Sequence, residues 1–129
     1  MPPLLLDTSV LIDVLRGSAA AERLRSLRPT EPVPYVCAVN VEEIWRGVRP
    51  EEEPVAERLL GSLRLAPLGA GEGRRAGTWR RTFAAAGVTL SQADCLIAAA
   101  ALGVGATLAT GNAKHFPMPE LTVEDWSAS

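Results

Sequence analysis

Short apolar runs alternate along the chain with longer stretches whose apolar residues recur at helical spacing. The runs at residues 4–6, 33–39 and 106–109 are short and apolar, and each is bounded by turn or cap residues. This pattern predicts buried strands. Weaker strands are predicted at residues 65–68 and 121–123.

Helices are predicted between these strands, because caps and breakers bound the periodic stretches. Ser9, Asn40 and Ser91 are the predicted N-cap residues, since each precedes a periodic run. Gly17 and Pro50 are expected to end two of the helices. The predicted helices span residues 10–15, 19–27, 41–48, 50–63, 71–86 and 92–102.

Strands that alternate with helices predict an α/β fold, with a parallel sheet covered by helices on both faces. With 129 residues, 47% of them hydrophobic, the chain suits a single domain spanning residues 1–129. Ligands of such sheets bind beyond the carboxyl ends of the strands. Residues that directly follow strands are therefore the first candidates for a functional site.

Composition and charge exclude several classes of protein. The formal net charge of −2 argues against a surface built for nonspecific DNA binding, although a nuclease needs only a local basic path. Two cysteines and one histidine are too few for a tetrahedral Cys/His zinc site. The longest apolar stretch, residues 95–109, has 15 residues and contains Gly103 and Gly105, so it predicts a buried helix and strand rather than a membrane span. We therefore expect a soluble, cytoplasmic protein.

Polar residues stand at four points where an apolar strand ends or a helix begins. Asp7 directly follows the first strand, and Glu43 and Asp94 each lie three residues after a predicted N-cap. Thr110 and Asn112 belong to the turn after a later strand. A parallel sheet flanked by helices would gather all four points at one edge.

Helix capping is the alternative explanation for two of these acids. Ser91 and Asp94 match a capping box, and Asn40 and Glu43 nearly match one. Asp7 is harder to explain in this way, because a carboxylate flush against a buried strand is costly without a partner. Three acids that converge on one edge of the sheet favour a site.

The chemistry of three clustered carboxylates points to a metal ion. Such groups repel one another and take up protons unless a cation lies between them. Ligands that are all oxygen atoms select a hard ion, Mg²⁺ or Mn²⁺. The ion activates water and neutralises charge on a phosphodiester. Asp7, Glu43 and Asp94 therefore predict metal-assisted hydrolysis rather than covalent catalysis.

Four segments, in order, resemble the motifs of PIN-domain nucleases. They are residues 5–13 (LLDTSVLID), 43–47 (EIWRG), 93–99 (ADCLIAA) and 108–116 (LATGNAKHF). Together they extend over nearly the whole chain, and four ordered motifs are more specific than one. The length of the chain and the spacing of the motifs are similar to those of the VapC toxins of type II toxin–antitoxin systems.

This resemblance implies a three-layer α/β/α sandwich with a central parallel sheet, and an endoribonuclease that depends on a divalent ion. Asp7, Glu43 and Asp94 would bind Mg²⁺ or Mn²⁺, and metal-bound water would attack an RNA phosphodiester in line. Toxins of this kind usually form homodimers, and a cognate antitoxin protein holds them inactive.

Asn112 departs from the family pattern, which often has Asp at this position. The change removes one negative charge and leaves open whether one or two ions bind. Asn112 is expected to ligate through its amide oxygen or to orient a bound water. The hydroxyl groups expected to support the acids belong to Thr8, Ser9 and Thr110.

Four arginines, Arg74, Arg75, Arg80 and Arg81, cluster around Trp79 in one predicted helix. One interpretation is an RNA-backbone path with a stacking ring. The other is a solvated helix face above a tryptophan that belongs to the core. The same basic face would also suit an acidic antitoxin tail.

Two further side chains have competing interpretations. Trp45, with the apolar faces of the early helices, would form a groove for an antitoxin helix, part of the core, or a homodimer contact. His115 is expected to fix the turn after Thr110 rather than to act as a base.

The leading hypothesis is a Mg²⁺-dependent endoribonuclease that acts as a toxin. A housekeeping RNA-processing nuclease is the second hypothesis, and a catalytically weak PIN-like module that binds RNA or protein is the third. Receiver and dehalogenase-like domains also place an acid after the first strand, but Ser9 stands where the dehalogenase type has its second Asp. The sequence indicates neither the RNA target nor the identity of the antitoxin.

Overall fold

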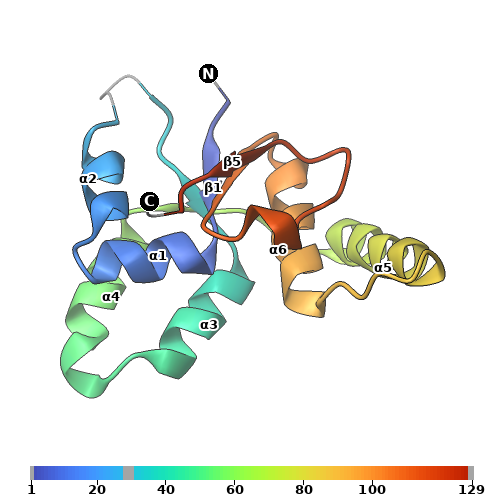
Figure 1. Cartoon of the computed structure of the whole chain (residues 1–129). Coiled ribbons are helices and arrows are strands. Elements are labelled where there is room, and N and C mark those ends of the chain that lie inside the picture. Colours follow the sequence, from blue (N-terminus) through green and yellow to red (C-terminus); the bar gives the residue numbers. More distant parts are fainter. Residues whose placement is uncertain (1, 28–30, 128–129) are drawn as a thin grey trace.

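Parallel strands form the central sheet of the computed structural model, which describes residues 2–27 and 31–127 (Figure 1). Within these residues the sheet has five strands in the order β3-β2-β1-β4-β5, and every neighbouring pair is parallel. The strands are β1 (Leu4–Leu6), β2 (Tyr35–Val36), β3 (Arg64–Leu65), β4 (Thr107–Thr110) and β5 (Val123–Asp125). The predicted parallel sheet is confirmed.

Helices connect the strands and cover both faces of the sheet (Figure 1). They are α1 (Thr8–Leu15), α2 (Ala19–Arg25), α3 (Ala38–Gly47), α4 (Glu53–Gly61), α5 (Ala70–Ala85) and α6 (Gln92–Gly103). Two 3-10 turns, η1 (Pro50–Glu52) and η2 (Ala113–His115), precede α4 and follow β4. The first four helices gather on one side of the molecule, and α5 packs beside α6 on the other.

Alternate residues of each central strand point into two separate cores. Leu5 and Leu108 belong to the core that α5 and α6 complete, whereas Leu6 and Ala109 belong to the core that α1 to α4 complete. All four side chains are fully buried. Because successive side chains of a strand point to opposite faces, each strand supplies both cores. The predicted three-layer α/β/α sandwich is confirmed.

The long apolar stretch forms the end of α6 and the strand β4, as predicted. Residues 98–101 are four alanines, and each is at most 1% exposed. Small side chains let α6 approach its neighbours closely, and α6 packs against both α5 and β4. Among the described residues, no helix is both long enough and apolar enough to span a membrane.

Two predicted helix caps are wrong. The N-cap of α1 is Asp7 rather than Ser9, and the N-cap of α3 is Cys37 rather than Asn40. Asn40 lies at the third helical position, where its Oδ1 accepts a hydrogen bond from the Cys37 N–H group. The prediction for α6 is confirmed, since Ser91 is its N-cap.

Strand bounds differ from prediction at β2, β3, β4 and β5. β3 covers Arg64–Leu65 rather than 65–68, and β4 covers Thr107–Thr110 rather than 106–109. The run at 33–39 forms a strand only over Tyr35–Val36, because Pro34 precedes it and α3 starts at Ala38. A strand predicted at 121–123 forms instead over Val123–Asp125. β5 pairs with β4 along the edge of the sheet, where residues 123–125 lie opposite residues 108–110.

Candidate metal centre and active site

Asp7 lies at the carboxyl end of the central strand β1 and starts α1. Its N–H group donates to the Ala109 carbonyl at 2.9 Å, which fixes the backbone beside β4. The residue is only 5% exposed. Its Oδ2 accepts hydrogen bonds from the Thr110 hydroxyl at 2.7 Å and from the Ser9 hydroxyl at 3.1 Å. The two hydroxyls therefore donate to the same carboxylate oxygen of Asp7.

The pKa of Asp7 is raised above its ordinary value, chiefly because burial disfavours the charged carboxylate. Hydrogen bonds from the Thr110 hydroxyl, the Thr8 backbone and the Ser9 hydroxyl oppose this shift. The negative charge of Asp94 makes the smallest contribution to the rise, which puts Asp94 within reach of Asp7. A cation between them would relieve both the burial cost and the repulsion.

The turn after β4 is tied to the same carboxylate. The Gly111 N–H group donates to the Ser9 hydroxyl at 3.0 Å, and the Asn112 N–H group donates to the Thr110 hydroxyl at 3.0 Å. Each hydroxyl thus links Asp7 to the turn. The Asn112 side chain is exposed, and the hydrogen bonds of the described residues involve its backbone rather than its amide.

Glu43 reaches the same edge of the sheet from α3. Its Oε1 accepts a hydrogen bond of 2.6 Å from the hydroxyl of Thr8, the residue after Asp7. Asn40, one turn earlier in α3 and fully buried, donates from Nδ2 to the Thr8 hydroxyl oxygen at 3.1 Å. The structure therefore joins the start of α1 to the acid of α3.

Asp94 lies in the first turn of α6. Its N–H group donates to the Ser91 hydroxyl at 3.1 Å, but the described hydrogen bonds include none from the Ser91 backbone to its carboxylate. Half of the predicted capping box is therefore present. The carboxylate lies 3.8 Å from Nδ1 of His115 instead. The sequence predicted that His115 fixes the turn after Thr110, and it did not predict this position beside Asp94. The one signal that could have indicated it is the place of His115 in the fourth motif, next to Phe116.

The three acids thus come to one edge of the sheet from three different elements. Burial raises the pKa of the Cys37 thiol, and the charges of Glu43 and Asp7 both add to that shift, which puts both acids near this thiol. Among the described residues, no group of three or more Asp, Glu, His or Cys side chains is arranged closely enough to hold a metal ion. The donor atoms still fit a hard divalent ion, because they are carboxylate oxygens supported by hydroxyl groups.

Comparison with known proteins identifies the family. A family model described as PIN domain matches residues 4–118. The chain belongs to the PIN-domain family. Ribonuclease VapC10 of Mycobacterium tuberculosis is 38% identical over 118 residues, which cover 91% of this chain and 88% of that relative.

Solved structures share the fold of this PIN domain. VapBC2 from Rickettsia felis, bound to a DNA fragment from its promoter, aligns with a TM-score of 0.84 at 21% identity, over 96% of this chain and 98% of that chain. A toxin–antitoxin complex from Klebsiella pneumoniae aligns with a TM-score of 0.78 at 22% identity, over 98% and 99% of the two chains.

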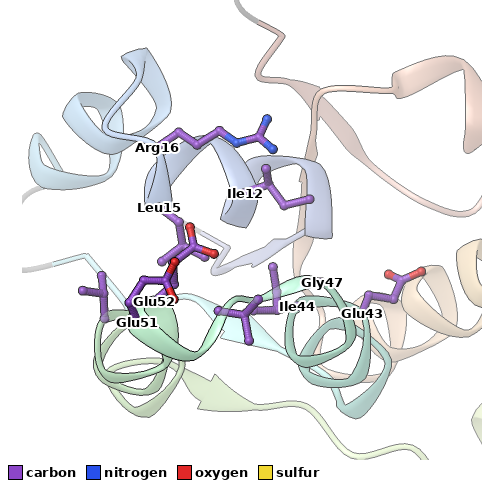
Figure 2. A pocket seen from close by; sticks show the side chains of 10 residues that line it. Ile12, Leu15, Arg16, Glu43, Ile44, Gly47, Glu51 and Glu52 are labelled. Atoms are coloured by element: carbon purple, nitrogen blue, oxygen red, sulfur yellow. The ribbon is translucent and has the colours of Figure 1, made fainter.

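A groove of about 360 Å³ runs between α1, α3 and α4 of the PIN domain (Figure 2). Its apolar lining comes from Ile12, Leu15, Ile44, Val48 and Val55. One arginine, Arg16, and three acids, Glu43, Glu51 and Glu52, supply its charged groups. Glu43 lies apart from the other two acids in Figure 2, so the groove ends at the acid of the candidate metal centre.

Trp45 belongs to neither the core nor this groove. It is 41% exposed, and the groove is lined by its neighbour Ile44 instead. The interpretation of Trp45 as core is therefore wrong, and its contact with an antitoxin helix or with a second copy of the chain stays a prediction.

The arginine cluster of α5 surrounds a buried tryptophan, as the second interpretation predicted. Trp79 is 5% exposed, and its Nε1 lies 3.3 Å from both carboxylate oxygens of Glu120. The Arg75 guanidinium lies 4.0 Å from the same carboxylate and 5.8 Å from the centre of the Trp79 ring. This ring is therefore not available to stack on a base.

The charge of Arg80 reaches the first turn of α6, at Cys95. Burial raises the pKa of the Cys95 thiol, and the positive charge of Arg80 opposes that rise. Cys95, like Asp94, lies in the first turn of α6, so Arg80 of α5 lies near this end of α6. Arg74, Arg75, Arg80 and Arg81 are all exposed.

Proposed function

We propose that this PIN domain is a Mg²⁺- or Mn²⁺-dependent endoribonuclease and the toxin of a toxin–antitoxin pair. One observation carries the proposal: the buried Asp7 carboxylate is held by two hydroxyls and senses the charge of Asp94. The ribonuclease name of the 38% identical relative supports the RNA substrate. The whole chain, residues 1–129, would act as one domain in the cytoplasm.

Asp7, Glu43 and Asp94 would hold the divalent ion. When bound, the ion supplies an activated water and neutralises charge on the phosphodiester. Thr110 and Ser9 would hold the Asp7 carboxylate by their hydrogen bonds to Oδ2, and Thr8 would hold Glu43 in the same way.

Two other groups would act on the RNA or on bound water. Asn112 would offer its exposed amide to the ion or to a bound water. Exposed arginines of α5 would bind RNA phosphates, because a guanidinium can hold a phosphate through two hydrogen bonds. The arginines proposed for this path are Arg74, Arg75, Arg80 and Arg81.

A substitution at Asp94 tests the activity. We expect Asp94→Asn to lower the rate of Mg²⁺-dependent cleavage of a mixed RNA pool by at least about 100-fold, since it removes a charge that the ion needs. Asp13→Asn is the matched control, because Asp13 is a half-buried acid on α1 that makes no side-chain hydrogen bond among the described residues. Full activity of Asp94→Asn would refute the assignment. A parent chain that binds RNA without cutting it would favour the binding-module alternative.

The groove between α1, α3 and α4 would hold the antitoxin. Its apolar lining suits one face of an amphipathic helix. Three glutamates against one arginine give the groove a negative balance, so the helix would carry basic residues. The toxin–antitoxin complex of the same fold supports this kind of partner.

A search for a small gene beside the gene of this chain, followed by co-expression of the two proteins, tests the toxin role. We expect the two proteins to purify together, and RNA cleavage to be lost in the complex. We also expect the free chain to elute as a homodimer in size-exclusion chromatography. Failure of the two proteins to purify together, with RNA cleavage unchanged in their mixture, would instead indicate a housekeeping RNA-processing nuclease.

A further inference from the structure

Asn40 is a fully buried amide whose two ends both make hydrogen bonds. Its Oδ1 accepts from the Cys37 N–H group at 2.8 Å, and its Nδ2 donates to the Thr8 hydroxyl oxygen at 3.1 Å. The Thr8 hydroxyl in turn donates to Oε1 of Glu43 at 2.6 Å. A continuous chain of hydrogen bonds therefore runs from the backbone of α3 to the acid.

The direction of every hydrogen bond in this chain is determined. The backbone N–H of Cys37 can only donate, so Oδ1 of Asn40 must face it and Nδ2 must face Thr8. The Thr8 oxygen accepts from Nδ2, which directs its single hydrogen toward Glu43. A distance of 2.6 Å is typical of a hydroxyl that donates to an ionised carboxylate.

We propose that Asn40 is a positioning residue for Glu43, acting through the Thr8 hydroxyl. The inference rests on the proposed function, because it assumes that Glu43 holds the divalent ion. A fixed hydroxyl hydrogen on Oε1 favours one orientation of the carboxylate and leaves Oε2 as the oxygen that would hold the ion. Outer partners of this kind commonly change metal affinity by about 10- to 100-fold.

Helix capping alone does not explain Asn40. Two other helices of the chain make the same capping bond with a glutamate: Glu52 accepts from the Arg49 N–H group at 2.9 Å, and Glu72 accepts from the Gly69 N–H group at 2.7 Å. A carboxylate suffices for that bond but has no N–H group to donate. Only the amide of Asn40 both caps α3 and orients Thr8.

Calorimetric titration of the full chain with Mn²⁺ tests the proposal. We expect Asn40→Ala and Thr8→Val each to weaken Mn²⁺ binding about tenfold. Because Asn40 acts through Thr8, we expect the double variant to bind Mn²⁺ as Thr8→Val does. Additive losses, or an unchanged affinity of folded Asn40→Ala, would overturn the proposal. Glu72→Ala is the matched control, since it removes only a capping bond and should leave Mn²⁺ affinity unchanged.

The Asn40 side-chain amide of the parent chain supplies a measurement that needs no substitution. Magnesium bound at Glu43 polarises the hydrogen-bonded chain, so we expect this amide resonance to shift during a Mg²⁺ titration with the midpoint of metal binding. An Asn40 amide that does not respond would overturn the proposal. Failure of the parent chain to bind either ion would overturn the proposed function together with this inference, whereas normal binding by Asn40→Ala would overturn the inference alone.

Discussion

Thr110 donates a hydrogen bond of 2.7 Å from its hydroxyl to Oδ2 of Asp7, although 103 positions separate the two residues in the sequence. The parallel register of β1 and β4 explains the contact, because Leu6 lies opposite Ala109 and each strand ends beside the other. The Thr110 side chain is fully buried. The Thr110 hydroxyl therefore supplies a fixed hydrogen bond to Asp7, the buried acid of the candidate site.

Thr110→Val should destabilise the metal-free protein by about 1–3 kcal/mol, because it removes a donor from a buried carboxylate. We also expect Mn²⁺ affinity to fall about tenfold. Urea denaturation and calorimetry measure the two effects. Thr78→Val is the control: the Thr78 hydroxyl donates to a backbone carbonyl on the exposed face of α5, so its loss should cost about 0.5 kcal/mol or less.

Asp7→Asn should stabilise the metal-free protein at neutral pH and raise its unfolding midpoint, because a neutral amide costs less to bury than a carboxylate. Burial raises the pKa of Asp7, so the folded state binds the proton more tightly than the unfolded state does. The parent therefore loses stability as the pH rises from the unfolded-state pKa of Asp7 to its higher folded-state pKa. The advantage of the variant should vanish below the unfolded-state pKa, at about pH 4. Thermal unfolding in EDTA at several pH values measures it. An advantage that persists at low pH would contradict the stated cause.

Arg80→Ala combined with Arg81→Ala should raise KM for RNA several-fold. The slope of log affinity against log salt concentration should become less steep, by the amount expected for the loss of about one to two phosphate contacts. The proximity of Arg80 to the helix end that carries Asp94 is the reason. The comparison variant is Arg75→Ala, whose guanidinium already pairs with Glu120 and should contribute less. Fluorescence anisotropy with a labelled RNA at several salt concentrations distinguishes them, and equal slopes for the parent and the double variant would remove Arg80 and Arg81 from the RNA path.

Val55→Arg should weaken binding of the co-expressed antitoxin at least about tenfold, because it places a bulky cation in a groove proposed to receive a basic helix. Val88→Arg is a close control: Val55 is 45% exposed and Val88 is 42% exposed, and Val88 lies outside the groove. Biolayer interferometry with the purified pair measures both affinities. An equal effect of the two substitutions would indicate that the partner does not use this groove.

Local patterns determined most of the elements. The apolar runs at the strands and the helical periodicity between them are properties of adjacent residues, so the α/β fold with a parallel sheet covered on both faces was predicted from them. Ser91 was identified as a cap because its signal lies within one turn of the helix. Asn40 was misassigned as a cap, because the local sequence does not show whether Asn stands at the N-cap or at the third helical position. Its hydrogen bond to Thr8, 32 residues away, is visible only in the folded chain.

The sequence by itself determined the order of strands and helices and the kinds of oxygen donors that the edge of the sheet carries. Only the tertiary structure decided which donor serves which acid: Thr110 for Asp7, Thr8 for Glu43, and the His115 imidazole beside Asp94. The physical reason is that hydrogen-bond direction and burial depend on strand register and helix packing. Those contacts join residues far apart in the chain, and no local periodicity records them.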